Sequence, residues 1–147
     1  MNREELLAAI APCGIDCVNC PVEERNVTPE LQARIGVMLG LPPETIFCKG
    51  CRSDQKAPLC PETCATFVCS VSKGVDFCFA CGEFPCSKFN PASDRADKLP
   101  HNLKVYNLCR MKMMGLERWL EEDACSTSFR YYRGKMVIGE GPKTGEE

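Results

Sequence analysis

FCFACGEFPC, residues 77–86, carries three cysteines, and only two residues separate the first from the second. A second pair with the same C-x2-C spacing lies in FCKGCR, residues 47–52. A tight turn of this kind brings both sulfur atoms onto one ion, and two such turns complete the thiolate tetrahedron that zinc prefers. Gly50 lies inside one turn and Gly82 directly follows the other, where glycine leaves backbone N–H groups free to face the thiolates. These segments therefore predict bound metal.

The remaining cysteines extend the pattern. The chain of 147 residues has 13 cysteines, of which only Cys109 and Cys125 lie beyond residue 86, and these two are expected to be buried in helices. CGIDCVNC, residues 13–20, adds a C-x3-C-x2-C group. The candidate metal ligands are Cys13, Cys17, Cys20, Cys48, Cys51, Cys60, Cys64, Cys69, Cys78, Cys81 and Cys86. We expect them to hold two or three zinc ions.

Several ligand groupings fit this set. One places the two C-x2-C pairs, Cys48, Cys51, Cys78 and Cys81, on one ion and leaves Cys60, Cys64, Cys69 and Cys86 for a second. Cys13, Cys17 and Cys20 then form a third centre or replace members of the other two. The single histidine, His101, is a conceivable twelfth ligand, but a histidine after a proline at a helix start is more typical of a surface or capping residue.

Zinc and an iron–sulfur cluster both take four cysteine ligands, so the alternative to zinc is an iron–sulfur redox or electron-transfer protein that uses Cys13, Cys17 and Cys20. C-x3-C-x2-C is also the cluster motif of radical enzymes. Those enzymes need a barrel of alternating strands and helices, and residues 21–147 show no such alternation. A zinc-dependent enzyme finds less support. Asp16, Glu23 and Glu24 lie beside cysteines, but the sequence contains no recognisable catalytic constellation.

Charge and hydropathy limit the partners. Lys plus Arg total 18 against 20 for Asp plus Glu, without a basic stripe, so we expect no nucleic-acid partner. The apolar run in MNREELLAAIAPCG is too short for a signal peptide and no segment reaches the length of a membrane span. We therefore expect a cytoplasmic protein without membrane contact, in which reduced cysteines favour metal over disulfides.

The predicted fold class is α+β. We expect a small metal-stabilised module of zinc-knuckle loops and short helices over residues 1–90, a linker over 91–100, and a helical C-terminal extension over 101–147. Helices are predicted over 2–11, 28–40, 62–74, 101–115 and 116–134, and a short strand over 135–139, before a frayed end. The residues expected to dock the extension on the module are Leu103, Tyr106, Met113, Met114, Leu116, Trp119 and Leu120.

CGIDCVNCP (13–21), FCKGC (47–51) and CSVSKGVDFCFACGEFPC (69–86) follow one another in the order typical of a known family. On these motifs, residues 11–90 resemble the cysteine-rich prokaryotic family catalogued as domain of unknown function 3795. The resemblance implies bound metal, zinc, with the candidate cysteines as ligands, although the spacing around Cys60 varies. It implies no activity. The function predicted is a structural-metal interaction module for a protein partner that the sequence does not identify.

Overall fold

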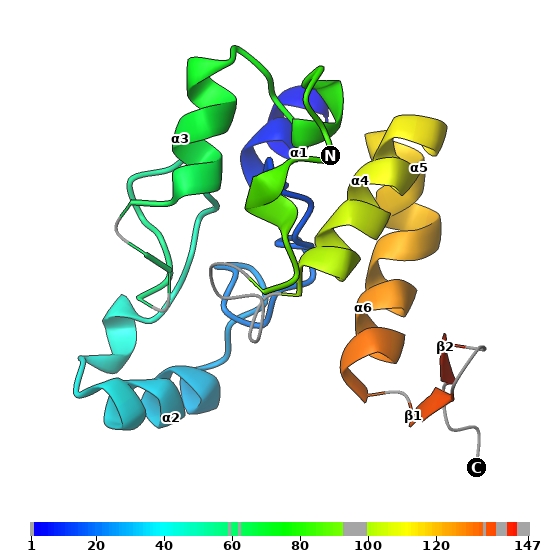
Figure 1. The fold of residues 1–147 in the computed structure, drawn as a ribbon. Helices are drawn as coiled ribbons and strands as arrows, with labels where there is room; N and C mark the ends of the chain where they lie inside the picture. Colours follow the sequence, from blue (N-terminus) through cyan, green and yellow to red (C-terminus); the bar gives the residue numbers. More distant parts are fainter. Residues whose placement is uncertain are drawn as a thin grey trace.

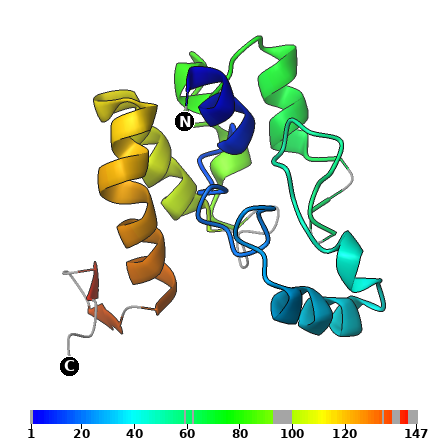
Figure 2. The same cartoon turned by 180° about the vertical axis from the view of Figure 1, so that it is seen from behind.

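The computed structural model describes residues 2–58, 60–61, 63–92 and 100–133, together with the backbone of 135–137 and 141–143. Helix α4 runs beside a column in which α5 continues into α6, and α1 lies between these helices and α3 (Figures 1 and 2). Helix α2 lies apart at the end of a long loop. The elements in chain order are α1 (Arg3–Ala9), α2 (Pro29–Leu39), η1 (Pro43–Thr45), α3 (Ala65–Ser72), η2 (Cys78–Ala80), η3 (Ser87–Phe89), α4 (His101–Met114), α5 (Leu116–Trp119), the π-helical η4 (Leu120–Ala124), α6 (Cys125–Arg133), β1 (Lys135–Val137) and β2 (Gly141–Lys143).

The predicted α+β class is wrong, because the described residues form a helical fold. Regular strand within them is confined to β1 and β2, an antiparallel pair in which Met136 faces Pro142. This hairpin adds no layer to the core. The cysteine loops form no ladder either, because they close on themselves through local bonds such as Cys81 N–H to the Cys78 carbonyl, at 3.0 Å. Outside the two strands, one isolated bridge joins Glu23 to Cys48.

The helix boundaries follow the sequence signals. Thr28 caps α2 by accepting a hydrogen bond from the Leu31 N–H at 3.2 Å, Pro29 takes the first helical position, and Gly40 ends the helix with φ of 67°. The helix predicted over 62–74 is α3, which ends before Gly74. Gly115 separates α4 from α5 as predicted. Among the described helices, none is long and apolar enough to cross a membrane.

Not every predicted boundary lies within the described residues. Residues 93–99 of the predicted linker lie outside them, as do residues 138–139 of the predicted strand and 144–147 of the predicted frayed end. The prediction of a frayed end is wrong for residues 141–143, because these form β2 and pair with β1. The sequence signal for β2 was weak, since Gly141 and Pro142 both disfavour strand.

One hydrophobic cluster joins the cysteine loops to the C-terminal helices. Its buried members are Leu6, Ile10, Ala11, Cys13, Phe77, Phe89, Leu108, Met111, Leu116, Trp119 and Ala124. Leu116 and Trp119 were predicted to dock the extension. Tyr106 and Met113 were predicted to do so as well, but these side chains are 45% and 76% exposed, and Leu108 and Met111 take that role. Apolar spacing alone misplaced the buried face of α4 because that face also carries the buried polar residue Asn107.

Asn107 connects α4 to the first cysteine loop. Its amide Nδ2 donates to the Gly14 carbonyl at 2.8 Å, across 93 positions of sequence. The backbone at Gly14 has φ of 85°, and a Cβ there would lie 2.5 Å from the Lys104 carbonyl oxygen and 2.7 Å from Leu108 Cγ. Glycine is therefore required at this position both for its backbone conformation and for the close approach of the loop to α4.

We predict that Gly14→Ala lowers the free energy of unfolding by about 3 kcal/mol, because it combines left-handed backbone strain with a steric clash against helix backbone. Gly40→Ala is the matched control. Gly40 has a similar φ of 67°, but a Cβ there would meet nothing within 4 Å, so the substitution should cost only about 1 kcal/mol. Urea denaturation of both variants measures the difference, and equal losses would contradict the close contact at Gly14.

Candidate metal centre

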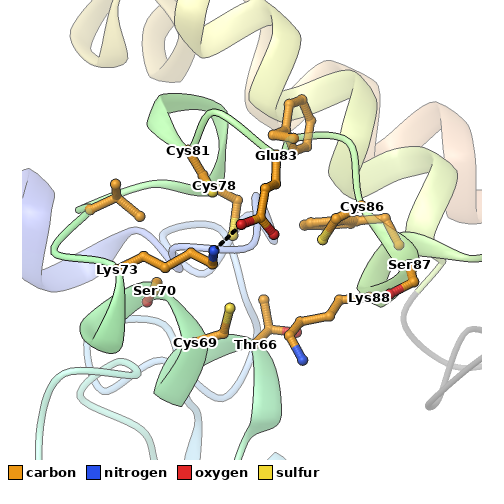
Figure 3. A pocket seen from close by; sticks show the side chains of 13 residues that line it. Thr66, Cys69, Ser70, Lys73, Cys78, Cys81, Glu83, Cys86, Ser87 and Lys88 are labelled. Atoms are coloured by element: carbon orange, nitrogen blue, oxygen red, sulfur yellow. Dashed lines mark hydrogen bonds and ion pairs between the residues drawn. The ribbon is translucent and has the colours of Figure 1, made fainter.

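Four of the candidate ligands line one pocket beside α3. Cys69 lies on α3, Cys78 and Cys81 flank the turn η2, and Cys86 precedes η3. Their side chains surround a cavity of about 100 Å³ (Figure 3). We call this set the α3 thiol group. It combines two cysteines of one C-x2-C turn with one cysteine on each side of that turn in the sequence, which is a complete donor set for a tetrahedral zinc ion.

Local packing fixes the turn that carries Cys78 and Cys81. Phe77 is buried and stacks on Phe79, with ring centroids 5.5 Å apart. The Cys78 N–H donates to the Pro12 carbonyl at 3.0 Å, which fastens the turn to the start of the first cysteine loop. After the turn, the Phe84–Pro85 peptide bond, directly before Cys86, is cis. Cys86 directly precedes η3, whose Phe89 reaches the core.

Two lysines place positive charge at the α3 thiol group. Lys73 forms an ion pair with Glu83 across the pocket, and Lys88 also lines it (Figure 3). The hydrogen bond from Lys73 lowers the pKa of Glu83, and the same bond, together with the nearby Cys81 and Cys69 sulfur atoms, raises the pKa of Lys73. A zinc ion with four thiolates carries a net charge of −2, so cations at its edge offset part of that charge.

Burial keeps Cys78 protonated when no cation is near. Desolvation raises the pKa of the Cys78 thiol to about 12, with the sulfur atoms of Cys13, Cys86, Cys69 and Cys81 contributing in the same direction. A thiolate at this position is therefore unfavourable by itself, because it would be both desolvated and close to other sulfur atoms. A metal cation reverses this balance and displaces the thiol proton on binding.

The other seven candidate ligands form a second group, which we call the first-loop thiol group: Cys13, Cys17, Cys20, Cys48, Cys51, Cys60 and Cys64. Five of them, Cys13, Cys48, Cys51, Cys60 and Cys64, line a cavity of about 80 Å³ together with Lys56 and Lys104. Cys17 and Cys51 share a hydrogen bond between their sulfur atoms, and Cys20 lies close enough to Cys48 for their charges to interact. Both cysteines of FCKGC therefore lie near the CGIDCVNC loop.

The thiol pKa values in the first-loop group diverge. The hydrogen bond to Cys17 lowers the pKa of Cys51 to about 7, assisted by the charges of Arg52 and Lys56. The same bond and burial raise the pKa of Cys17 well above its ordinary value. Burial also raises the pKa of Cys13, to about 11. Of this pair, Cys51 is therefore the thiol that loses its proton more readily.

The structure does not bring together the four cysteines of the two C-x2-C pairs, which the sequence analysis placed on one ion. Cys78 and Cys81 lie with Cys69 and Cys86, whereas Cys48 and Cys51 lie with cysteines of the first loop and with Cys60 and Cys64. In neither group do the sulfur atoms already converge to bonding distance: across the part of the chain that is described, no three His, Cys, Asp or Glu side chains form a ready metal-binding cluster.

Three further predictions concern residues outside the two groups. His101 is 3% exposed and its ring lies edge-on to that of Phe89, with the centroids 6.1 Å apart, so the prediction of a surface residue is wrong. His101 lines neither thiol cavity. Cys109 and Cys125 lie in helices as predicted, but both are exposed rather than buried.

Sequence reasoning missed Arg52, the residue that joins the loops of the two groups. Its guanidinium donates to the carbonyls of Leu7, Ile10 and Asp76, with 2.7 Å to Ile10, and lies 5.4 Å from the Phe77 ring centroid. Arg52 directly follows Cys51, and Phe77 directly precedes Cys78. Arg52 therefore ties the segments that carry the two C-x2-C turns to each other and to the end of α1. Its position after the turn was the only signal in the sequence.

We predict that Arg52→Ala lowers the free energy of unfolding by about 2–4 kcal/mol, because it leaves the carbonyls that Arg52 bonds without that donor and removes the contact to Phe77. Arg34→Ala, at an exposed position on α2, should change it by less than about 0.5 kcal/mol. Chemical denaturation followed by near-ultraviolet circular dichroism measures both. A loss for Arg52→Ala no larger than that for Arg34→Ala would show that the bridge is not needed.

Comparison with known proteins agrees with the motif order. A family described as "Protein of unknown function (DUF3795)" matches residues 9–91, more than half of the chain. The chain belongs to this family. The DUF3795 match begins just before Cys13 and ends just after η3, so it includes every cysteine of both thiol groups and neither Cys109 nor Cys125. No curated protein and no solved structure matches the chain.

Proposed function

We propose that this DUF3795 protein is a structural-metal protein in which zinc bound by thiolates holds the cysteine loops together. The observation that carries the proposal is the α3 thiol group, in which Cys69, Cys78, Cys81 and Cys86 line one small cavity. Four thiols around a space of about 100 Å³ provide the donor type and number of a closed structural zinc site. A closed site leaves zinc no open position for substrate, which favours a structural role over catalysis.

The need for metal follows from how little else holds these loops. Among the described residues between α1 and α4, the buried members of the hydrophobic cluster are Ile10, Ala11, Cys13, Phe77 and Phe89. Bound structural zinc contributes on the order of 10 kcal/mol of apparent free energy to folding, which is comparable with the whole stability of a small domain. Metal therefore supplies the stability that this part of the chain lacks in apolar burial.

The first-loop thiol group supports a second centre. Seven thiols exceed the four ligands of one zinc ion, and two tetrahedral ions that share a bridging thiolate would use all seven. With one ion at the α3 thiol group, the total is two or three zinc ions. The alternative at this group is an iron–sulfur cluster held by Cys13, Cys17 and Cys20, which would add a redox role. In either case, the exposed surface is where a protein partner would bind.

We predict that Cys81→Ser removes about one zinc ion per chain, because serine replaces a ligand of the α3 thiol group. Cys109→Ser is the matched control, since Cys109 is exposed on α4 and should retain the wild-type zinc content. Elemental analysis of anaerobically purified protein measures zinc and iron together. Equal zinc in the two variants would refute this ligand set. Iron with acid-labile sulfide, and a visible absorption that dithionite bleaches, would establish the iron–sulfur alternative.

We predict that complete chelation abolishes the cooperative thermal transition of the cysteine-rich segment, because the stability contributed by metal exceeds the margin of a small domain. Differential scanning calorimetry before and after chelation, under reducing conditions, measures this change. Zinc added back should restore the transition. A chelated and reduced protein that keeps its melting temperature would show that metal is not structural.

A further inference from the structure

A larger cleft lies outside the α3 thiol group, between the first cysteine loop and helices α4 and α6. Its volume is about 480 Å³, which falls within the range of roughly 300–1,000 Å³ typical of small-molecule sites. Helices α4 and α6 run next to each other in both views (Figures 1 and 2). The family match ends at residue 91, so α4 and α6 add this cleft to the cysteine-rich family segment from outside it.

The walls of the cleft are largely apolar. Phe129 and Tyr132 lie three residues apart on α6, and their side chains are 50% and 59% exposed. Ile15, Pro21 and Leu103 line the cleft as well. Covering these two partly exposed aromatic rings with an apolar ligand would lower the free energy by removing apolar surface from water. A flat aromatic ring is the shape that packs best against them.

The charge in the cleft is predominantly positive. Lys104 and Arg133 line it, and among the described residues neither forms an ion pair. The Arg133 guanidinium carbon lies over the Phe129 ring, 5.4 Å from its centroid, and Arg133 is exposed, so a ligand can reach its N–H groups. Lys104 also borders the first-loop thiol cavity, so its charge acts on both sites.

The carboxylate that lines the cleft, Asp16, is occupied by internal hydrogen bonds. It accepts bonds from the Asn19 backbone N–H at 3.1 Å, from Asn19 Nδ2 at 2.9 Å and from Ser128 Oγ at 3.1 Å. The bond to Ser128 joins the first cysteine loop to α6 across the cleft. Asp16 therefore holds the first cysteine loop and α6 in position. Because its oxygen atoms already accept these hydrogen bonds, they are poorly placed to bind a cationic ligand.

The wall formed by α6 is held in place from its other side. Asp123, at the end of η4, is buried and accepts hydrogen bonds from Arg110 Nε on α4 at 2.8 Å and from Thr127 Oγ1 at 2.7 Å. Burial alone would raise the pKa of Asp123, but these bonds and the Arg110 charge lower it, so the carboxylate stays ionised and paired. The cleft is thus formed before any ligand enters, which reduces the entropic cost of binding.

We propose that this cleft binds a small aromatic carboxylate, with its ring against Phe129 and Tyr132 and its carboxylate at Lys104 and Arg133. The apolar walls select a flat hydrophobic body, and the two cations select an anionic group. The site is distinct from the proposed zinc ligands except for Cys20, which lies in its wall. The inference does not require the metal proposal, because none of the four residues that contact the ligand belongs to a thiol group.

The test uses 2-naphthoate as the probe and its neutral analogue 2-naphthylmethanol, titrated into the full-length protein as purified and followed by calorimetry. We expect saturable binding of naphthoate that is about tenfold tighter than that of the alcohol. Arg133→Gln and Lys104→Gln should each weaken naphthoate binding by about tenfold and leave binding of the alcohol unchanged. Phe129→Ala should weaken binding of both probes, since both place their rings on the same wall.

Matched controls separate a specific site from general charge attraction. Lys112 lies on α4 away from the cleft, and Arg130 lies on α6 but borders a different surface beside Glu121 and Glu122. Lys112→Gln and Arg130→Gln should both bind naphthoate as the wild type does. Equal affinity for naphthoate and the alcohol, equal losses in the controls, or no saturable binding would overturn the proposal. Metal content is measured on every variant, so that a failure of the cleft proposal can be told apart from a failure of the zinc proposal. If Lys104→Gln proves unstable, the Arg133→Gln variant still tests the cleft, because Arg133 is exposed.

Discussion

The close contact between the first cysteine loop and α4 is the constraint on which most of the structure depends. Because Gly14 has no side chain, its backbone approaches the carbonyl of Lys104, and Asn107 fixes that approach with a buried hydrogen bond. The loop held in this way places Cys13 in the core and Cys17 against Cys51. The same loop provides Asp16 and Ile15 to the cleft. One long-range contact thus positions both the first-loop thiol group and the wall opposite α6.

The two thiol groups have different relations to the rest of the fold. The α3 thiol group is assembled from cysteines within 18 consecutive residues, 69–86, and lies beside two lysines, Lys73 and Lys88. The first-loop thiol group combines cysteines from residues 13 to 64 and lies next to α4 through Lys104. The first can form from local turns, whereas the second requires that distant loops are already in place.

Local signals were sufficient for most of the helices. Thr28, Pro29 and Gly40 set the ends of α2 through capping and left-handed geometry, which depend only on near neighbours. The fold class could not be predicted in the same way. A C-x2-C turn gives no information on whether its flanks pair as strands, and here hydrogen bonds within the turn and the contact with Pro12 replace such pairing. The buried face of α4 was also misjudged, because the polar Asn107 lies on it and Met113 does not.

The sequence by itself determined the inventory of thiol donors, the ends of the principal helices and membership of the DUF3795 family, since spacing, capping and motif order are local properties of the chain. Only the tertiary structure decided which cysteines are neighbours. The partners of Cys48 and Cys51 depend on Arg52, which reaches carbonyls 42 and 45 residues earlier and 24 residues later in the chain. The cleft likewise exists only because α6 packs beside a loop 112 residues away along the chain, joined by the bond from Ser128 to Asp16. Contacts over such separations depend on packing of the whole chain, which no local spacing encodes.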